Sequence, residues 1–427
     1  MKRHRIQIFA VMIAMACLLY YQYQTYTNRP LPEGRKVVVC IPTYGQSLAL
    51  GEEAVRVTDF ERLKDDYDGR ILTENLDYRF GYFENNKVKK FFKKLFHYQK
   101  RAFELSVYRM AESLATQLGN DTLICIFAGG QGTTMLQDLS RGTEPYNRFL
   151  DNIRTAHEKA TKLGWQFYVP AICWMQGESD ITVYLDTDYK QLLRQFCSDI
   201  NRDVQAITHQ TTPVCFISYQ TNAVARASQF DAHSYDCREV AVPQALMELI
   251  RDDSLFWPSG PIYHYTYARE AIHIDGVSQN RLGQLAAKSA LRIIRHQEHL
   301  YGLMPTQPTT EGNDIVLSFR VPCPPLRLDT VNVSKADNYG FNVVTKRGTD
   351  ILTSVSVGDS IVRLTCSQPP SGCKLRYAVN GELGKSGCLH GPRGNLRDSQ
   401  GDTDSIAVAG QTFPKHNWCY QFEALVP

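Results

Sequence analysis

The chain has 427 residues, of which 43% are hydrophobic and 21% are charged, and its formal net charge at pH 7 is +3. This composition is that of a globular protein and excludes a disordered chain or one embedded in a membrane along its length. The small net charge gives no reason to expect a nucleic-acid partner. Because the length exceeds one ordinary hydrophobic core, we expect two domains.

The N-terminus combines a basic start with an apolar run. Residues 2–5 are Lys, Arg, His and Arg, and the apolar run extends from Ile6 to about Tyr21. This pattern predicts an exported protein, either secreted or membrane-anchored, with residues 1–30 as a signal peptide or N-terminal anchor. Residues 14–16 offer a small-residue cleavage site, whereas the apolar continuation favours a membrane tether, although a spanning helix needs about 20 apolar residues. Both alternatives stay open.

Twelve cysteines are spread over the chain. Four lie inside apolar, strand-like runs, where a thiol behaves as a small core hydrophobe: Cys40, Cys125, Cys173 and Cys215. Five lie in the C-terminal third, close enough in sequence for one or two disulfides: Cys323, Cys366, Cys373, Cys388 and Cys419. No CxxC pair or histidine spacing indicates a zinc site, and we expect no metal or cofactor.

The first strand is predicted at Val37–Ile41, an apolar run without polar alternation, which is typical of a strand buried on both faces of a parallel sheet. It leads into Gly45-Gln46-Ser47. A serine at the carboxyl end of a central strand stands where open α/β sheets place reactive groups, although an ordinary polar turn is an equal alternative here. The polar segment that follows, to about Asn86, is long for a connection and is predicted to be an insertion or a lid.

Next, apolar residues at helical spacing predict an amphipathic helix over Val88–Phe96, with lysines on its other face. We interpret those lysines as a solvated face, with contact to an anionic polysaccharide or lipid as the alternative. A second helix is predicted over Ala102–Leu118.

Four more strand–helix units follow, with strands at 122–127, 166–174, 213–219 and 255–257 and a last helix from Gln279 to about His299. This alternation predicts an α/β fold, a three-layer α/β/α parallel sheet. From Met304 the pattern changes to short alternating runs divided by Gly, Asp, Asn and Pro, which predict a small, sandwich-like all-β domain. We therefore assign residues 31–304 to the α/β domain and residues 305–427 to the all-β domain.

Polar segments follow the predicted strands where reactive groups belong: Gly45-Gln46-Ser47, Gly130–Thr133, Trp174–Glu178, and the segment that holds Glu270 and His273. They supply a hydroxyl, backbone N–H donors, a side-chain amide and an acid–imidazole pair. Those are the groups that acyl transfer needs.

Over about residues 35–300 these segments resemble the SGNH (GDSL-type) hydrolases, and specifically the sialate O-acetylesterase-like carbohydrate esterases. The motifs that carry the resemblance are Gly45-Gln46-Ser47, Gly132-Thr133, Trp174-Met175-Gln176-Gly177-Glu178 and Glu270-Ala271-Ile272-His273. The resemblance implies an SGNH/flavodoxin-like fold without a metal. It also implies a serine esterase that removes O-acetyl groups from a carbohydrate, sialic acid or a polysaccharide, through an acyl-enzyme.

By the same resemblance, Ser47 is the nucleophile, His273 its base and Glu270 the acid of the triad. The backbone N–H groups of Ser47 and Gly132, with the side-chain amide of Gln176, are expected to form the oxyanion hole. Gln46, Thr133 and Glu178 are expected to support these residues from behind, and Trp174 to lie in the core.

Two positions depart from the family pattern. Glu270 stands where the family more often has aspartate, so Asp275 is the alternative acid, and Leu48 replaces the asparagine usual after Gly-Gln-Ser. These departures leave open a glycan-binding protein without turnover. Another acyl chemistry, that of a lipase-like esterase or an O-acetyltransferase of the same fold, is a further alternative.

Overall fold

The structure is a computed structural model, and it describes residues 12–15, 17, 33–78, 103–182 and 188–427. The predicted lysine-rich helix at 88–96 and most of the N-terminal apolar run lie outside these residues. In the part of the chain that is described, no helix has the length and apolar character needed to cross a membrane.

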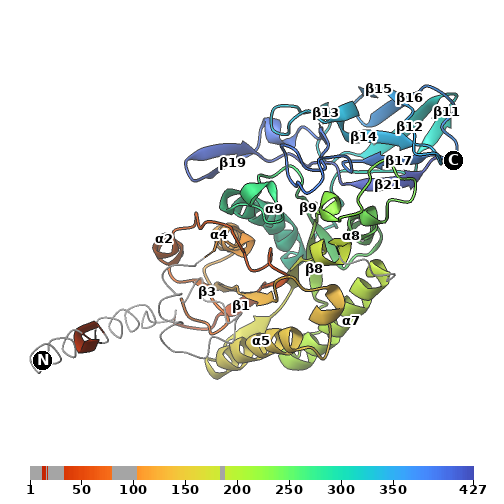
Figure 1. Cartoon of the computed structure of the whole chain (residues 1–427). Coiled ribbons are helices and arrows are strands. Elements are labelled where there is room, and N and C mark those ends of the chain that lie inside the picture. Colours follow the sequence, from red (N-terminus) through yellow and green to blue (C-terminus); the bar gives the residue numbers. More distant parts are fainter. Residues whose placement is uncertain (1–11, 16, 18–32, 79–102, 183–187) are drawn as a thin grey trace, which may run out of the picture.

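A parallel sheet forms the centre of the N-terminal region (Figure 1). Three of its strands are interrupted, so that each appears as two segments that continue one another. From one edge to the other the sheet contains β3 (Ile71–Leu72), β4 (Thr122–Cys125) with β5 (Ala128–Gly130), β1 (Val37–Cys40) with β2 (Thr43–Gly45), β6 (Gln166–Tyr168) with β7 (Ala171–Met175), β8 (Cys215–Gln220) and β9 (Phe256–Pro261).

Without the edge strand β3, and with each interrupted strand counted once, the strands stand in the order second, first, third, fourth, fifth. This is the flavodoxin-like order, so the predicted α/β parallel-sheet fold is confirmed. The single strand predicted at 166–174 is divided at Val169 and Pro170. Proline has no N–H to donate to a ladder, which explains a break there and at Pro42 in the first strand.

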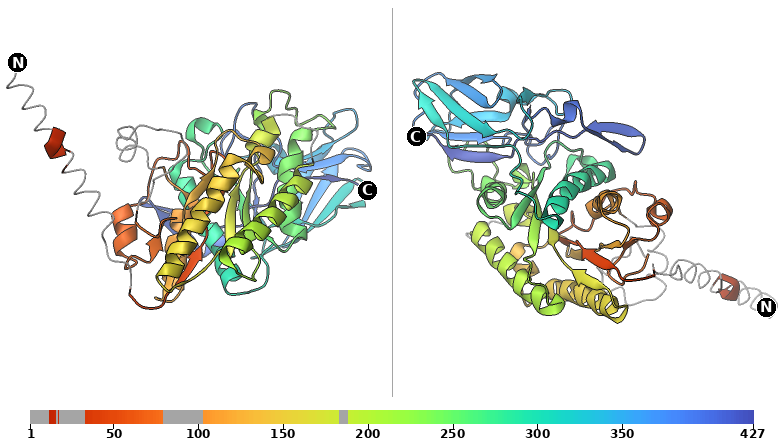
Figure 2. Two further views of the ribbon diagram at one scale, coloured as in Figure 1. Left: turned by 90° about the horizontal axis from the view of Figure 1, so that it is seen from below. Right: turned by 180° about the vertical axis from the view of Figure 1, so that it is seen from behind.

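Helices cover both faces of the sheet, as Figure 2 shows. On one face α4 (Ser106–Gln117) packs against α9 (Gly276–Ile294). On the other, α5 (Glu144–Lys162) packs against α7 (Tyr189–Thr208), which in turn contacts α8 (Ala241–Asp252). The last helix ends at Ile294, earlier than the predicted 299. It also starts earlier than the predicted 279, because the Asp275 side chain accepts a hydrogen bond from the Ser278 N–H and caps the helix at Gly276.

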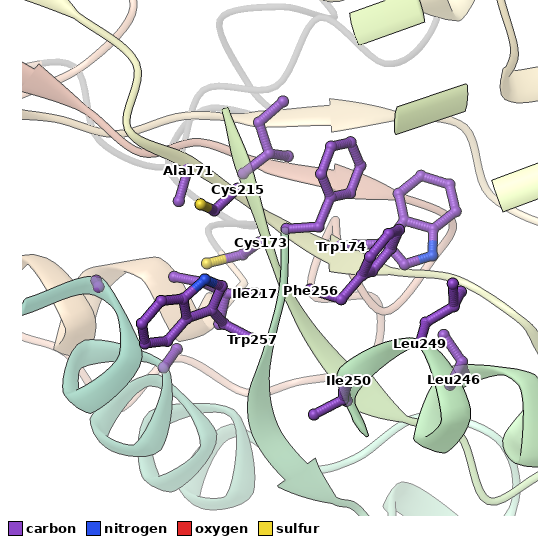
Figure 3. Close-up of a cluster of buried hydrophobic side chains, with 14 of the residues drawn as sticks. Ala171, Cys173, Trp174, Cys215, Ile217, Leu246, Leu249, Ile250, Phe256 and Trp257 are labelled. Carbon is purple, nitrogen blue, oxygen red and sulfur yellow. The ribbon is translucent and has the colours of Figure 1, made fainter. Parts of the chain in front are cut away.

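Aromatic and aliphatic side chains fill the space between the sheet and its helices (Figure 3). Trp174 is fully buried, as predicted, and its ring lies 4.8 Å from that of Phe196. The four cysteines predicted to be core residues are buried as well. All twelve cysteines fall within the described residues and are free thiols there, so the structure contains none of the disulfides considered for the C-terminal third.

The paired strands of the C-terminal region are antiparallel, which confirms the predicted all-β character. One sheet contains β10 (Met304–Pro305), β11 (Thr309–Glu311), β12 (Asp314–Arg320), β15 (Leu352–Val357) and β16 (Ile361–Cys366). A second contains β14 (Phe341–Val344), β17 (Lys374–Tyr377) and β21 (Phe422–Leu425), and two short pairs are β13 (Arg327–Leu328) with β18 (Leu396–Arg397) and β19 (Ser405–Val408) with β20 (Gln411–Pro414). The β19–β20 hairpin extends over α9 (Figure 1). The boundary at 304/305 stays a prediction.

Buried polar contacts join the two regions. The Arg376 side chain is fully buried on β17 and donates hydrogen bonds to the carbonyl oxygens of Ala232, Ser234 and Tyr235, at 2.6–2.9 Å. Its Nε also lies 2.8 Å from the carboxylate of Glu423. The C-terminal region is therefore fixed to the loop that precedes α8.

Candidate active site

The nucleophile candidate Ser47 stands in a tight turn directly after β2. The N–H groups of Leu50 and Glu52 donate to the Ser47 carbonyl at 3.1 and 3.0 Å, which folds the chain back on the serine. Glycine is required beside this turn, because a Cβ on Gly130 would lie 1.8 Å from the carbonyl oxygen of Gly45. The strand ends β2 and β5 can therefore approach closely enough to present Ser47 at the edge of the sheet.

His273 reaches this serine from the other end of the domain. Its Nε2 lies 2.8 Å from the Ser47 Oγ. A short hairpin holds it there: the Ala268 N–H donates to the His273 carbonyl at 2.8 Å, and Tyr267 pairs with Ile274. The structure thus brings together the two residues predicted to be nucleophile and base.

The acid beside the histidine is Glu53. Its Oε2 lies 2.9 Å from His273 Nδ1, and this hydrogen bond lowers the pKa of the Glu53 carboxyl group, which keeps it ionised. Sequence reasoning missed this residue because it lies in the polar segment interpreted as an insertion or a lid. The available signal was an acidic pair, Glu52-Glu53, immediately after the glycine that ends the serine turn.

Glu270 does not contact His273, and the predicted pairing is corrected here. It stands at the tip of the hairpin with a φ of 51°, and its carboxylate instead lies 2.8 Å from His390 Nδ1 and 3.3 Å from Lys385 Nζ. The hairpin turns the backbone of residue 270 away before the chain returns to the histidine. The alternative acid, Asp275, is the N-cap of α9.

A close backbone contact brings Glu53 to the histidine. At the first residue of α9, a Cβ on Gly276 would lie 1.8 Å from the carbonyl oxygen of Val55. Only glycine allows this approach. The segment that follows the serine turn therefore packs directly against α9, the helix that follows His273.

Two backbone donors near the serine are free. Within the described residues, neither the Ser47 N–H nor the Gly132 N–H donates to any acceptor. Backbone N–H groups of this kind can receive the negative charge that develops on a carbonyl oxygen under attack. Thr133, next to Gly132, is exposed and has a φ of 54°.

The amide of Gln176 is not available as a third donor. It is fully buried, and its Nε2 donates to the Thr134 carbonyl at 3.2 Å and to the Asp180 carboxylate. Its Oε1 accepts a hydrogen bond from the Tyr189 hydroxyl at 2.8 Å. The predicted oxyanion role of Gln176 is therefore corrected: the amide ties the loop after β7 to α6 (Glu178–Thr182) and α7.

Gln46 and Glu178 are both buried. The Gln46 Oε1 accepts from the Ser179 N–H at 3.2 Å, which joins the serine turn to α6. One oxygen of Glu178 accepts from the hydroxyls of Tyr219 and Thr221, at 2.5 and 2.7 Å. The other oxygen has no partner among the described residues, and burial raises the pKa of this carboxyl group.

Apolar side chains form the floor beneath the serine turn. Leu48 is buried in a cluster that includes Met175, Tyr219 and Ile274. The departure at Leu48 thus gives an apolar contact instead of a polar group. Within the described residues, no group of three or more His, Cys, Asp or Glu side chains is arranged to hold a metal ion.

A second carboxylate stands on the open side of the histidine. The Oε2 of Glu52 lies 3.9 Å from His273 Nε2, and its side chain is 47% exposed. A Cβ added to Gly132 would lie 3.2 Å from its Oε1, so Glu52 also borders the free backbone donor. The site thus contains a hydroxyl, an imidazole, two acids and two free N–H groups, which is the equipment for attack on an ester carbonyl.

Comparison with known families agrees with this chemistry. The family model described as "Carbohydrate esterase, sialic acid-specific acetylesterase" matches residues 99–292. The chain is a carboxylic ester hydrolase. The match confirms the predicted resemblance and includes Gly132, Gln176 and His273, whereas Ser47 and Glu53 precede it. No curated protein sequence matches the chain.

One of the similar solved structures shares the fold. A novel carbohydrate acetylesterase of Xanthomonas citri, XAC1771, superposes with a TM-score of 0.57 at 12% identity, over 90% of this chain and 80% of that one. NanS gives a TM-score of 0.43 at 12% identity, over 62% and 100%. A protein of Arabidopsis thaliana, AT4G34215, gives 0.40 at 16% identity, over 60% and 98%.

Proposed function

We propose that this esterase removes O-acetyl groups from a carbohydrate, sialic acid or a polysaccharide, with a triad of Ser47, His273 and Glu53. The observation that carries the proposal is the unbroken hydrogen-bond chain from Ser47 Oγ through the His273 ring to Glu53, with separations of 2.8 and 2.9 Å. A serine hydroxyl attacks an ester only when a base takes its proton, and a carboxylate on the far nitrogen fixes the tautomer of that base. The family match supports an acetyl ester as the bond that is cleaved.

The geometry supports a two-step reaction. Ser47 Oγ attacks the acetyl carbonyl carbon while its proton passes to His273 Nε2. The tetrahedral intermediate then collapses: the bond to the sugar oxygen breaks, and His273 returns the proton to that oxygen. A water molecule, which gives a proton to His273, attacks the acetyl-serine, and acetate leaves as Ser47 regains its hydrogen.

Backbone N–H groups stabilise the negative charge on the tetrahedral intermediate. The N–H groups of Ser47 and Gly132 are free of other acceptors in the described structure and are the donors that we assign to the developing oxyanion. Glu53 stays ionised and balances the positive charge that His273 carries between the two proton transfers. Glu52, 3.9 Å from the same ring, adds to that balance.

The test is acetate release from p-nitrophenyl acetate and from O-acetylated N-acetylneuraminic acid by the full chain and its Ser47→Ala variant. We expect a loss on the order of 10⁴-fold in the variant, since removal of a triad member costs that much in serine hydrolases. Ser356→Ala, on the exposed side of β15, is the matched control and is expected to behave as the parent protein. Equal rates for Ser47→Ala and the parent would refute the mechanism.

Related functions give different results in the same assay. A lipase-like esterase would prefer long acyl chains over acetate, and an O-acetyltransferase would move the acetyl group to an added sugar. A glycan-binding protein without turnover would release no acetate that depends on Ser47. We propose, separately, that the protein is exported through residues 1–30, and N-terminal sequencing of the membrane and secreted fractions tests this.

A further inference from the structure

A pocket lies between the hairpin that carries His273 and the C-terminal β region. Its volume is ≈ 390 Å³, within the range of about 300–1,000 Å³ that is typical of small-molecule sites. We call it the rim pocket. The hairpin contributes Thr266, Tyr267, Arg269 and Glu270, and the C-terminal region contributes Lys385, Ser386, Cys388 and Leu389.

The rim pocket and the triad meet at Arg269. This side chain lines the pocket, and its guanidinium lies 3.9 Å from the carboxylate of Glu53, the residue that holds His273. The N–H of the preceding residue, Ala268, donates a hydrogen bond to the carbonyl oxygen of His273. A molecule in the rim pocket therefore lies against the same hairpin that positions the base.

The wall from the C-terminal region is fixed in place. The Ser386 N–H donates to the Glu270 carbonyl, and the Cys388 N–H to the Tyr265 carbonyl, each at 3.1 Å. Between them Gly387, with a φ of 89°, approaches so closely that a Cβ would lie 2.6 Å from the Tyr267 ring. A wall held by such contacts needs little ordering when a ligand binds, which favours affinity.

The polar groups of the rim pocket suit a sugar. Arg269 is 85% exposed and Lys385 is 41% exposed, so both cations are accessible donors, and the Glu270 carboxylate beside Lys385 is an acceptor. Sugar hydroxyls both donate and accept hydrogen bonds, so they match a mixed set of this kind. The half-exposed Leu389 adds an apolar surface for the C–H face of a ring.

We propose that the rim pocket binds the sugar that leaves with the ester oxygen, and that Arg269 and Lys385 determine which acetylated sugars the esterase accepts. This inference rests on the proposed function and extends it, because it gives the C-terminal β region a part in substrate binding. Hydrogen bonds from a charged group to a ligand are worth enough to change kcat/KM about tenfold each.

The experiment compares an acetate ester whose leaving group is an aromatic ring with acetate esters of sugars. Values of kcat/KM are measured on p-nitrophenyl acetate, on O-acetylated N-acetylneuraminic acid and on glucose pentaacetate. The variants are Arg269→Ala, Lys385→Ala and Lys385→Arg in the full chain. The matched controls are Arg347→Ala and Lys346→Ala, two exposed cations of the C-terminal region far along the chain from the rim pocket.

The rim-pocket proposal is tested by a ratio of kcat/KM values. The numerator is the value for whichever sugar ester is cleaved faster, and the denominator is the value for p-nitrophenyl acetate. We expect the two alanine variants to lower this ratio about tenfold, Lys385→Arg to restore most of it, and the controls to keep the parental ratio. An unchanged ratio in both alanine variants would overturn the inference, as would a parent protein that cleaves p-nitrophenyl acetate but neither sugar. Failure of the Ser47 mechanism is distinct from both, because it removes Ser47-dependent hydrolysis of every ester.

Discussion

Glu53 and His273 are 220 positions apart in the sequence, and the carboxylate of the first lies 2.9 Å from Nδ1 of the second. The acid thus belongs to the same turn as the nucleophile Ser47, six residues further along. The segment after β2 therefore supplies both the nucleophile and the acid, whereas the hairpin before α9 supplies the base.

Replacement of Glu53 by glutamine should lower kcat on p-nitrophenyl acetate by about 10²- to 10⁴-fold, because an amide no longer balances the imidazolium. Steady-state kinetics with purified protein measure the effect. Glu270→Gln is the comparison, since Glu270 pairs with His390 and Lys385 instead. A larger loss in Glu270→Gln than in Glu53→Gln would contradict our assignment of the acid.

Gly276→Ala should reduce kcat by about 10²-fold, since a displacement of catalytic groups by roughly 1 Å costs that much. The added Cβ would stand 1.8 Å from the Val55 carbonyl oxygen and force the chain beside Glu53 outward. Gly119→Ala is the control, because its Cβ would meet no atom within 4 Å. Activity and circular dichroism of both variants are to be compared, and a fully active, folded Gly276→Ala would count against this account.

Glu178→Gln should change how stability depends on pH. Burial raises the pKa of Glu178 in the folded protein, so the folded state keeps this proton longer than the unfolded state does. The associated stability is fully present below the unfolded pKa of about 4.3 and is lost as the pH rises through the folded pKa.

The glutamine side chain of the variant cannot ionise, so the variant does not lose this stability as the pH rises. Urea unfolding between pH 4 and pH 8 should therefore show the parent losing stability relative to Glu178→Gln as the pH rises. Two curves that stay parallel over this range would mean that Glu178 has the same pKa in both states.

Arg376→Ala should destabilise the protein by about 3–5 kcal/mol, because it removes a buried charge that is paired with Glu423 and bonded to three carbonyl groups. Arg363→Ala is the matched control on the neighbouring sheet. Arg363 is 41% exposed, and because its ion pairs lie at the solvent-exposed surface, their loss should destabilise the protein far less. Similar unfolding free energies for the two variants would show that Arg376 is not a structural anchor.

The fold could be predicted because each unit repeats one local pattern, an apolar run followed by a helix, and that pattern alone specifies a parallel sheet. The sequence also allowed Ser47, Gly132 and His273 to be singled out, since each follows a strand or precedes the last helix in a short motif. These are local relationships, and local sequence contains them.

The contacts of Glu53 and Gln176 could not be predicted from the sequence, because their partners depend on packing between distant segments. The position of Glu53 follows from the contact between Val55 and Gly276. The engagement of Gln176 follows from where α6 places Asp180 and where α7 places Tyr189. An acid three residues before a histidine suggests a pair, but two successive positive φ angles, at Arg269 and Glu270, direct that acid elsewhere.

The 226 positions between Ser47 and His273 also affect the order of events during synthesis. At about 5–20 residues per second, a ribosome needs roughly 11–45 s to add that length of chain. Throughout that interval the emerging polypeptide contains its nucleophile but no base, so the serine is chemically inert toward esters in its surroundings. Activity can therefore begin only after the hairpin that carries His273 has been synthesised and has packed against the serine turn.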